Sequence, residues 1–398
     1  MLLKGLKIVD FSAYIAGPGA ACILGDWGAE VIKVERPGGD SMRHVFGDHK
    51  NDLGANPIFD LDNRGKRGIV LDITKPEGRD ALAKLAATAD VFLTNVRPVS
   101  LHRYGLDDKT LRTANPRLVY AVITGYGLEG PDAHKPGFDV TAFWARAGVA
   151  NMTAPKGMDP FMLRTGFGDH ITSLATVSAI LAALYEREKT GQGRLVQTSL
   201  LATGVWTVSS DLAVQLKFGR LASNRRRDNP VNAMSNFFKS ADDRWFVHNP
   251  RGSSGGWEKF CSVAGRADLV TDERFATGKA RRQNAGELTQ AFDAAFSALP
   301  FDEIARRLDA ADMVWSAVQT PAEVAADPQV AAAGGFIDVE DGQGGTFRSP
   351  AAPARFPGAD ATVRPRAPRL GEHTREVLAE LGYGEAVIEA MMAAGAAG

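Results

Sequence analysis

The sequence contains few cysteines. Cys22 and Cys261 are the two cysteines among its 398 residues, and neither belongs to a C-x-x-C pair. A disulfide framework and a zinc site are therefore not indicated, and a reducing cytoplasmic location is expected. The segment Met1–Gly5 also leads directly into a strand-like run, without the apolar core and cleavage site of a signal peptide.

An excess of charge of either sign is also missing, since 46 basic residues stand against 47 acidic ones. A broad basic surface for nucleic acid is therefore not expected, and any anion site must be local. The longest apolar run, 171–185, is interrupted by Thr and Ser and ends in Glu186–Lys189. We expect it to be too short and too polar to span a bilayer, so no membrane partner is expected.

Several common catalytic motifs are absent. The sequence contains no G-x-x-x-x-G-K-[ST], no H-E-x-x-H and no G-x-S-x-G, which disfavours the usual phosphate-loop, zinc-protease and serine-hydrolase sites. Gly17-Pro18-Gly19 could open a dinucleotide site with Glu35 as the ribose ligand. However, five residues separate Phe11 from Gly17, and Cys22 stands where the third glycine belongs, so a nicotinamide enzyme is disfavoured.

The first half of the chain alternates strand-like apolar runs with helix patterns, which predicts an α/β fold with a parallel, doubly wound sheet. The helix patterns cover Ala16–Trp27, Pro76–Ala87, Ile171–Leu184 and Leu201–Phe218. The predicted strands are Leu6–Phe11, Glu30–Val34, Ile69–Asp72, Val91–Asn95, Leu118–Thr124 and Leu195–Leu200.

The pattern changes after Arg225–Pro230. From about 232 to 330, short strands such as Trp245–His248 and charged helices such as Ala285–Phe296 predict a smaller α+β domain. The segment Gly342–Arg369 is rich in Gly, Pro and Ala, so we expect an extended surface segment, followed by a final helix over Arg375–Leu381.

Asp169 follows two glycines in Gly166–His170 and directly precedes the long helix pattern. Unpaired backbone N–H groups at a helix start create a positive field, which could keep this carboxylate ionised for a substrate. Asp is also a preferred N-cap residue, so a purely structural role is the alternative. His170 is either a proton carrier or a packing or capping residue.

Basic residues lie in loops near predicted strand ends. If these loops share one edge of the sheet, they form a pocket for a polyphosphorylated ligand; taken singly, each is explained by surface charge. They are Arg36, Lys66, Arg67, Arg97, Arg103 and Lys135. The stretch Gly252–Gly256 is either a mobile lid or an ordinary loop.

Many short motifs, in order along the chain, resemble the class III coenzyme A transferases. They include Leu6–Ser12, Ala16-Gly17-Pro18, Gly28–Glu35, Gly39-Asp40, Asn63–Arg67, Ala89-Asp90-Val91, Asn95, Gly125-Tyr126-Gly127, Gly168-Asp169, Lys189–Gly193 and Leu370–Thr374. The resemblance implies a Rossmann-like large domain from 1–200 and 330–398, a linker over 201–231 and a small domain over 232–329. It also implies an interlocked homodimer.

The resemblance further implies that Asp169 is the catalytic nucleophile of a CoA transfer between an acyl-CoA and a carboxylic acid. The reaction passes through an aspartyl anhydride and an aspartyl-CoA thioester. CoA is then a substrate, and no metal or other cofactor is expected. By the same resemblance the residues at or beside the CoA positions are Arg36, Lys66, Asn95, Val96, Arg97, Arg103 and Lys135.

Two alternatives remain within the resemblance. Related 2-methylacyl-CoA racemases use the histidine of a Gly-His-Asp motif, where this chain has Gly137-Phe138-Asp139, and phenylalanine cannot carry a proton. The other alternative is a non-catalytic acyl-CoA-binding protein, which the intact Asp169 disfavours. Ile15 stands where oxalate-specific members have glutamine, which disfavours oxalate as substrate. The run Gly137–Arg146 and Gly168-Asp169-His170 resemble transferases for aryl or branched 2-hydroxy and enoyl acids.

Overall fold

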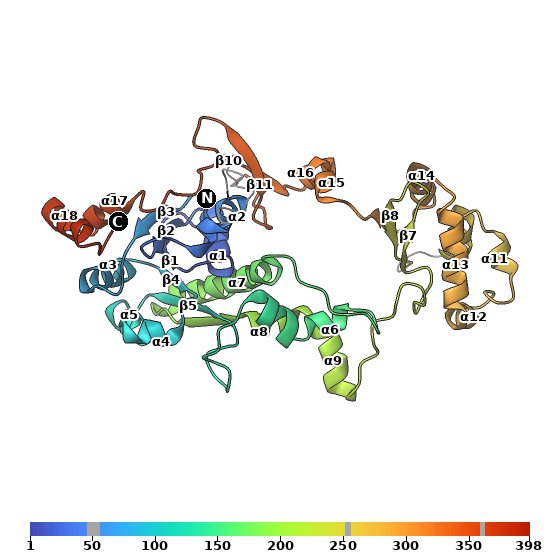
Figure 1. Ribbon diagram of the computed structural model, residues 1–398, viewed down its shortest axis with the longest axis horizontal. Coiled ribbons are helices and arrows are strands. Elements are labelled where there is room, and N and C mark those ends of the chain that lie inside the picture. The colour runs from blue at the N-terminus through green and yellow to red at the C-terminus, as the bar shows by residue number, and fades with distance from the viewer. Residues whose placement is uncertain (46–55, 251–255, 359–362) are drawn as a thin grey trace. The chain divides into compact units, whose positions relative to one another are not determined.

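The computed structural model describes residues 1–45, 56–250, 256–358 and 363–398, and divides into two compact units. Unit 1 comprises 1–151, 161–220 and 329–398, and unit 2 comprises 152–160 and 221–328. Both ends of the chain therefore belong to unit 1 (Figure 1).

Unit 1 contains a six-stranded parallel sheet of order β3-β2-β1-β4-β5-β6. The direction of strand addition reverses between β1 and β4, as in a doubly wound fold. The strands are β1 Lys7–Phe11, β2 Glu30–Glu35, β3 Arg67–Val70, β4 Val91–Thr94, β5 Val119–Thr124 and β6 Leu195–Ser199.

The helices of unit 1 connect these strands or follow them, and two of them, α6 Val149–Thr153 and α16 Pro328–Ala332, include residues of unit 2. They are α1 Ala16–Asp26, the 3₁₀ turn η1 Ser41–His44, α2 Pro57–Asn63, α3 Pro76–Ala87, α4 Pro98–Arg103, α5 Asp108–Ala114, the π-helix η2 Asp139–Arg146, α6 Val149–Thr153, α7 Phe167–Thr190, α8 Leu200–Thr207, α9 Ser209–Phe218, α16 Pro328–Ala332, α17 Thr374–Glu380 and α18 Glu385–Ala393. The single helix expected over 201–218 is therefore two helices, which meet at Val208, where the backbone angles are not helical.

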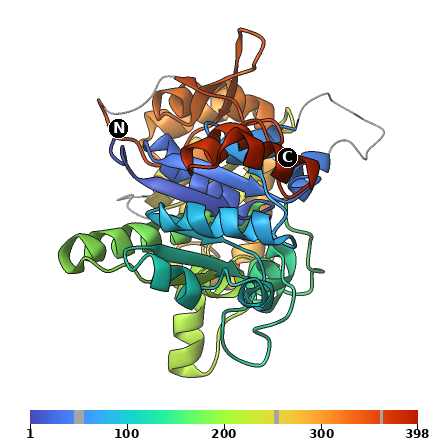
Figure 2. The same ribbon diagram turned by 90° about the vertical axis from the view of Figure 1, so that its left-hand side faces the viewer.

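The sheet is covered on both faces because successive strand residues point to opposite sides. Ile8 and Val91 face the core formed with α1 and α7. Val9 and Phe92 face the core formed with α3, α4, α5, α17 and α18. Figure 2 shows α17 and α18, in red, beside the blue strands. The predicted doubly wound arrangement is thus present.

Helix α7 is longer than the apolar run at 171–185 suggested. Among the described residues it is the one helix whose length and composition would suffice to cross a membrane. Its buried residues, such as Val177 and Ile180, pack in the core with α1 and the sheet. In this structure α7 is therefore a core helix of unit 1.

The C-terminal part of unit 1 differs from expectation. The segment 342–369 contains β11 Thr346–Pro350 and β12 Val363–Arg364, which pair with β10 Phe336–Glu340 in a three-stranded sheet. The Gly and Pro content of this segment hid both strands. Residues 341–345 form the turn of an antiparallel hairpin in which Glu340 of β10 pairs with Thr346 of β11, and β12 pairs in parallel with β10 through Val363 and Asp338.

The C-terminal segment also closes the exposed edge of β3. The backbone N–H of His373 donates to the carbonyl of Gly68 over 2.9 Å, and the N–H of Val70 donates to Thr374 Oγ1 over 3.1 Å. The N–H of Asp72 donates to the carbonyl of Ala396 over 2.9 Å. An edge strand with unpaired polar groups is thereby covered.

Unit 2 is a small α+β unit whose antiparallel sheet has the order β7-β8-β9. Its core is dominated by phenylalanine rings, with Phe238 in contact with Phe246, Phe260 and Phe296 at centroid distances of 5.2–5.8 Å. The elements are β7 Asn236–Lys239, β8 Trp245–His248, α10 Gly256–Val263, α11 Asp268–Thr271, α12 Gly278–Gln283, α13 Ala285–Phe296, α14 Phe301–Ala310, β9 Trp315–Ala317 and α15 Pro321–Ala326.

Two buried lysines hold the turn between β1 and α1 over the sheet. Lys66 Nζ lies 2.8 Å from Asp10 Oδ2 and donates to the carbonyl of Pro18 over 2.9 Å. Lys33 Nζ lies 3.0 Å from Asp40 Oδ2 and donates to the carbonyl of Ser12 over 3.1 Å. Buried charges are tolerated only when paired and hydrogen-bonded, so these contacts fix the turn.

We expect Asp10→Asn to lower the free energy of unfolding by about 3–5 kcal/mol, because it leaves the Lys66 ammonium buried without its charge partner. Denaturant unfolding followed by circular dichroism measures the loss. Glu186→Gln, at the exposed Arg194–Glu186 pair, is the matched control, with an expected change of about 0–1 kcal/mol. Equal changes in the two variants would contradict this assignment.

Candidate active site

Most of the residues predicted to bind CoA follow the carboxyl ends of strands, whereas Lys66 directly precedes β3 and Arg103 ends α4. Arg36 directly follows β2, Asn95–Arg97 follow β4, and Lys135 lies in the segment after β5. Because the strands are parallel, their carboxyl ends share one edge of the sheet, where ligands of doubly wound folds bind. The structure therefore brings these loops to one edge.

Asn95 joins the two loops at the point where the strand order reverses. Its Oδ1 accepts the backbone N–H of Ala13 over 2.9 Å, and its Nδ2 donates to the carbonyl of Ala13 over 2.7 Å. Tyr14, which follows Ala13 in the chain, has a left-handed backbone with φ of 67°, and its N–H donates to Asp40 Oδ1. The turn before α1 is therefore fixed in an unusual conformation.

Four of the predicted cations are exposed. Arg36 donates only locally, to the carbonyl of Gly39 and to Ser41 Oγ, and Lys135 pairs with Asp132 at 2.6 Å. Arg103 lies at the end of α4, and the side chain of Arg97 has no hydrogen-bond or charge partner in the part of the chain that the structure describes. Such guanidinium groups are available to anions.

Val96 is partly buried against the sheet core.

Lys66 occupies a different position. Its ammonium is buried and donates to Asp10, to the carbonyl of Pro18 and to Asn63 Oδ1. An ammonium has three hydrogens, and all three are used inside the protein. A direct contact with CoA would require one of these bonds to break, so the geometry gives Lys66 a supporting place beneath the turn.

Asp169 is the third residue of α7 and is not its N-cap. The N-cap is Gly166, whose φ of 78° is a left-handed conformation that glycine adopts without strain. Gly168 allows close packing on η2, because a Cβ there would lie 2.6 Å from the ring of Phe143. The capping interpretation of Asp169 is therefore wrong, and its half-buried carboxylate is left for another role.

Asp139, the first residue of η2, acts at the start of α7 instead. Burial raises the pKa of Asp139, while the backbone N–H groups of Val140, Gly168 and Gly166 oppose this rise. Burial and the negative charge of Asp139 together raise the pKa of Asp169 to about 7, with His170 opposing them. Two carboxylates thus meet at the end of one helix, and each disfavours ionisation of the other.

His170 contacts a residue that the sequence did not indicate. Its Nε2 lies 3.1 Å from Oδ1 of Asp62, which is buried near the end of α2. The sequence interval between the two residues gives no signal, because the contact exists only once α2 and α7 both pack against α1. Asp62 and Asp139 therefore extend the predicted site.

Aromatic side chains stand close to these carboxylates. The rings of Tyr14 and Phe138 meet edge to face at 5.4 Å, and Phe138 is 54% exposed although it directly precedes Asp139. Phe167, two residues before Asp169, is 51% exposed. Large exposed apolar groups beside a carboxylate cluster form a surface suited to an apolar ligand.

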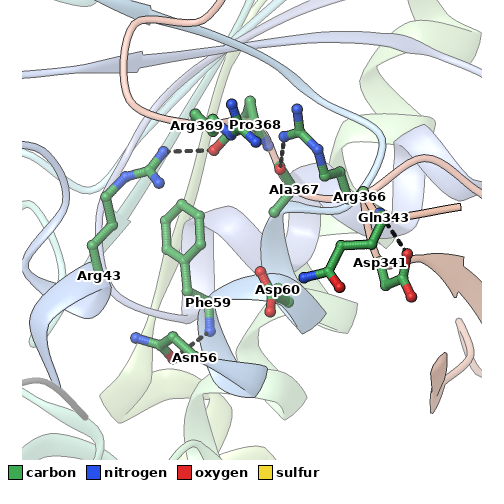
Figure 3. A pocket seen from close by; sticks show the side chains of 11 residues that line it. Arg43, Asn56, Phe59, Asp60, Asp341, Gln343, Arg366, Ala367, Pro368 and Arg369 are labelled. Atoms are coloured by element: carbon green, nitrogen blue, oxygen red, sulfur yellow. Dashed lines mark hydrogen bonds between the residues drawn. The ribbon is translucent and has the colours of Figure 1, made fainter. Parts of the chain in front are cut away.

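Unit 1 also contains a pocket of about 300 Å³ between α2 and the C-terminal segment (Figure 3). Its guanidinium groups at Arg43 and Arg366 pair with Glu35 and Glu372. None of the residues predicted to bind CoA lines this pocket.

Residues 252–255 of the glycine-rich stretch lie outside the described residues, and Gly256 is the first residue of α10. Among the residues that are described, no group of three or more His, Cys, Asp or Glu side chains is placed to hold a metal ion.

Comparison with known proteins identifies the family. The profile of CoA-transferase family III matches residues 3–374, and the chain belongs to that family. It is 33% identical over 387 residues to the (R)-2-hydroxy-4-methylpentanoate CoA-transferase of Clostridioides difficile, covering 97% of this chain and 96% of the relative.

Two further likenesses agree. The chain is 33% identical over 392 residues to the cinnamoyl-CoA:phenyllactate CoA-transferase of Clostridium sporogenes, covering 98% of this chain and 95% of the relative. It is similar to the crystal structure of a CaiB/BaiF family protein from Brucella suis, with a TM-score of 0.85 and 33% identity, over 95% of this chain and 99% of that one. The resemblance noted from the sequence motifs is thus confirmed.

Proposed function

We propose that this enzyme transfers CoA from an acyl-CoA to a free carboxylic acid, with Asp169 as the nucleophile. The observation that carries the proposal is a half-buried carboxylate in the first turn of α7 that caps nothing. Family membership and the CoA-transferase names of the relatives support it. Phe138 occupies the place of the racemase histidine, so proton exchange at the α-carbon has no base there.

The proposed reaction has four balanced steps. A carboxylate oxygen of Asp169 attacks the thioester carbonyl, and CoA thiolate leaves, which gives an anhydride. The thiolate attacks the aspartyl carbonyl and releases the first acid, leaving an aspartyl-CoA thioester. The acceptor carboxylate then displaces the thiolate, and the thiolate attacks the new acyl carbonyl to release Asp169. No step needs a metal or redox cofactor.

The proposal places CoA along the carboxyl edge of the sheet. Arg36, Arg97, Arg103 and Lys135 supply positive charge there, and Asn95 and Val96 shape the loop between β4 and α4. Guanidinium groups bind phosphates through paired hydrogen bonds, which suits the diphosphate and 3′-phosphate of CoA. Lys66 supports the turn beneath them.

For the acyl group we propose a branched or aromatic acid. Tyr14, Phe138 and Phe167 present apolar surface close to Asp169, and Ile15 lies beside Gly166. The names of the two relatives, which specify a methylpentanoate with a 2-hydroxyl group and a phenyllactate, agree with that chemistry.

We also propose a homodimer. Large apolar side chains on α8 and α9 are exposed in the single chain: Trp206 is 77%, Leu216 85% and Phe218 68% exposed, and α9 buries none of its residues. A helix with this composition is expected to be covered by a protein partner.

A covalent adduct at Asp169 is the main test. During turnover, hydroxylamine or borohydride is expected to modify Asp169, because the anhydride and the thioester are both electrophilic at its side-chain carbonyl. Peptide mass spectrometry identifies the modified residue. Asp169→Ala is expected to abolish transfer while CoA still binds.

A reaction in deuterated water separates CoA transfer from racemisation. A 2-methylacyl-CoA in deuterated water without acceptor acid is expected to keep its α-hydrogen, whereas added carboxylate accepts CoA. Deuterium uptake without CoA exchange across a panel of acids would overturn the proposal in favour of racemisation.

The pH dependence follows from the pKa of Asp169. Since only the ionised carboxylate is nucleophilic and its pKa is raised to about 7, kcat/KM is expected to fall about tenfold for each pH unit below that value and to level off above it. Acceptor acids are ionised throughout this pH range, so the fall of kcat/KM at low pH, the acid limb of the profile, reports a group of the enzyme. An acid limb near the ordinary carboxyl pKa would contradict the burial of Asp169.

Substituting Arg36, Arg97 or Arg103 by Ala is expected to weaken CoA binding about tenfold or more, because each lost charge-assisted contact contributes roughly 1.5–3 kcal/mol. Isothermal titration at low and high salt measures the loss, which shrinks as salt screens the charges. Arg117→Ala, just before the amino end of β5, is the matched control at the opposite edge. Unchanged affinity in all three variants would remove this CoA site.

The dimer is tested by sedimentation equilibrium, which is expected to give twice the mass of 42.5 kDa. Leu216→Glu with Phe218→Glu replaces two exposed apolar side chains of α9 by charges and is expected to raise the dissociation constant of the dimer at least tenfold. Glu188→Lys, an exposed charge change on α7, is the control. A monomeric wild type would contradict the proposed homodimer.

A further inference from the structure

Asp62 and His170 form a pair across 108 residues of sequence. The carboxyl group of Asp62 is buried, with the residue only 2% exposed, and its Oδ1 lies 3.1 Å from His170 Nε2. Its other oxygen, Oδ2, is buried without a hydrogen-bond partner among the described residues. Burial raises the pKa of Asp62, while the hydrogen bond and the positive charge of His170 oppose this rise, so an ionised Asp62 depends on His170 as its charge partner.

Two glycines leave room for the pair. A Cβ on Gly19 of α1 would lie 3.1 Å from Asp62 Oδ1 and 3.6 Å from His170 Cδ2. A Cβ on Gly166 would lie 3.2 Å from Cε1 and 3.3 Å from Nδ1 of the same imidazole. The ring is therefore confined by the backbone of α1 and the start of α7, while the His170 side chain remains 43% exposed.

The charges that face the imidazole are carboxylates. Asp62 comes from α2, Asp139 from η2, and Asp169 precedes His170 in α7. Burial lowers the pKa of His170, but the hydrogen bond to Asp62 and these negative charges raise it above its ordinary value. Behind Asp62 lie Lys66, Arg64 and the Cys22 thiol, whose pKa burial raises to about 12, so that it stays neutral.

We propose that Asp62 is a positioning residue that holds His170 as a cation beside Asp169, which favours the ionised form of the nucleophile against the effects of burial and of its carboxylate neighbours. The inference rests on the proposed role of Asp169. A fixed positive charge within a few ångströms favours the ionised form of a carboxylate, and a like charge disfavours it. His170 therefore offsets the effect of Asp139 at the start of α7.

Two variants test the electrostatic role. His170→Gln removes the charge but keeps a group that hydrogen-bonds to Asp62. The acid limb of kcat/KM is expected to move up by about one pH unit, with activity about tenfold lower at pH 6 and unchanged at pH 9. Asp62→Asn is expected to move the limb in the same direction by less, because the lost negative charge of Asp62 partly cancels the lost imidazolium.

A spectroscopic measurement tests the pair without any activity. The chain has seven histidines, and the C2–H resonance that disappears in His170→Gln assigns His170 in the proton NMR titration. In the wild type this resonance is expected to titrate above the ordinary value of about 6.5, and in Asp62→Asn at a lower pH than in the wild type. A purely structural Asp62 would move neither this titration nor the acid limb.

Asp60→Asn is the matched control. Asp60 lies on the same helix, but its carboxyl group faces Arg43 and Arg366. Both the acid limb and the His170 titration are expected to stay as in the wild type. A wild-type His170 titration at or below the ordinary value, or a His170→Gln limb that coincides with the wild type, would overturn the inference even if Asp62→Asn does not fold.

Failure of the proposed function gives a different result. An active wild type in which Asp169 is never trapped would overturn the nucleophile. A trapped Asp169 together with an unmoved acid limb in His170→Gln would overturn only the pair.

Discussion

Two ammonium groups buried beneath the turn between β1 and α1 determine how the candidate site is built. Lys66 holds Asp10 and the carbonyl of Pro18, while Lys33 holds Asp40 and the carbonyl of Ser12. Removing water from these charges costs several kcal/mol per ion, so each ammonium group stays buried only while its charge partner and its hydrogen bonds compensate that cost. The backbone that carries Tyr14 and receives Asn95 is consequently rigid before any ligand binds.

The sequence was most informative where the signal is local. The strands predicted over 30–34 and 91–95 lie close to the observed β2 and β4, because buried parallel strands are rich in Val, Ile and Leu, although β2 also contains Glu30, Lys33 and Glu35. The placement of Arg36, Asn95 and Arg97 followed from that topology alone. In contrast, the Gly- and Pro-rich composition of 342–369 hid β11 and β12, and α18 was missed near the end of the chain.

The environment of Asp169 shows the same limit at the level of single side chains. Its position before a long helix was readable, but whether it caps that helix was not, because the N-cap is Gly166 and Asp139 accepts backbone N–H groups there, which only tertiary packing determines. Asp62 gave no signal at all. Its neighbours in α2 have ordinary helix character, and its importance arises from the contact with His170.

The way the chain closes the sheet has a consequence for its synthesis. The exposed edge of β3, made from residues 67–70, is covered by hydrogen bonds from residues 373–398. Unit 2 is inserted between the two parts. During synthesis on the ribosome, the edge of β3 therefore stays unpaired until more than 300 further residues have been added. An unpaired strand edge can form hydrogen bonds with other chains. The insertion can fold meanwhile from its own phenylalanine core, and the edge of β3 is covered only when residues 373–398 have been made.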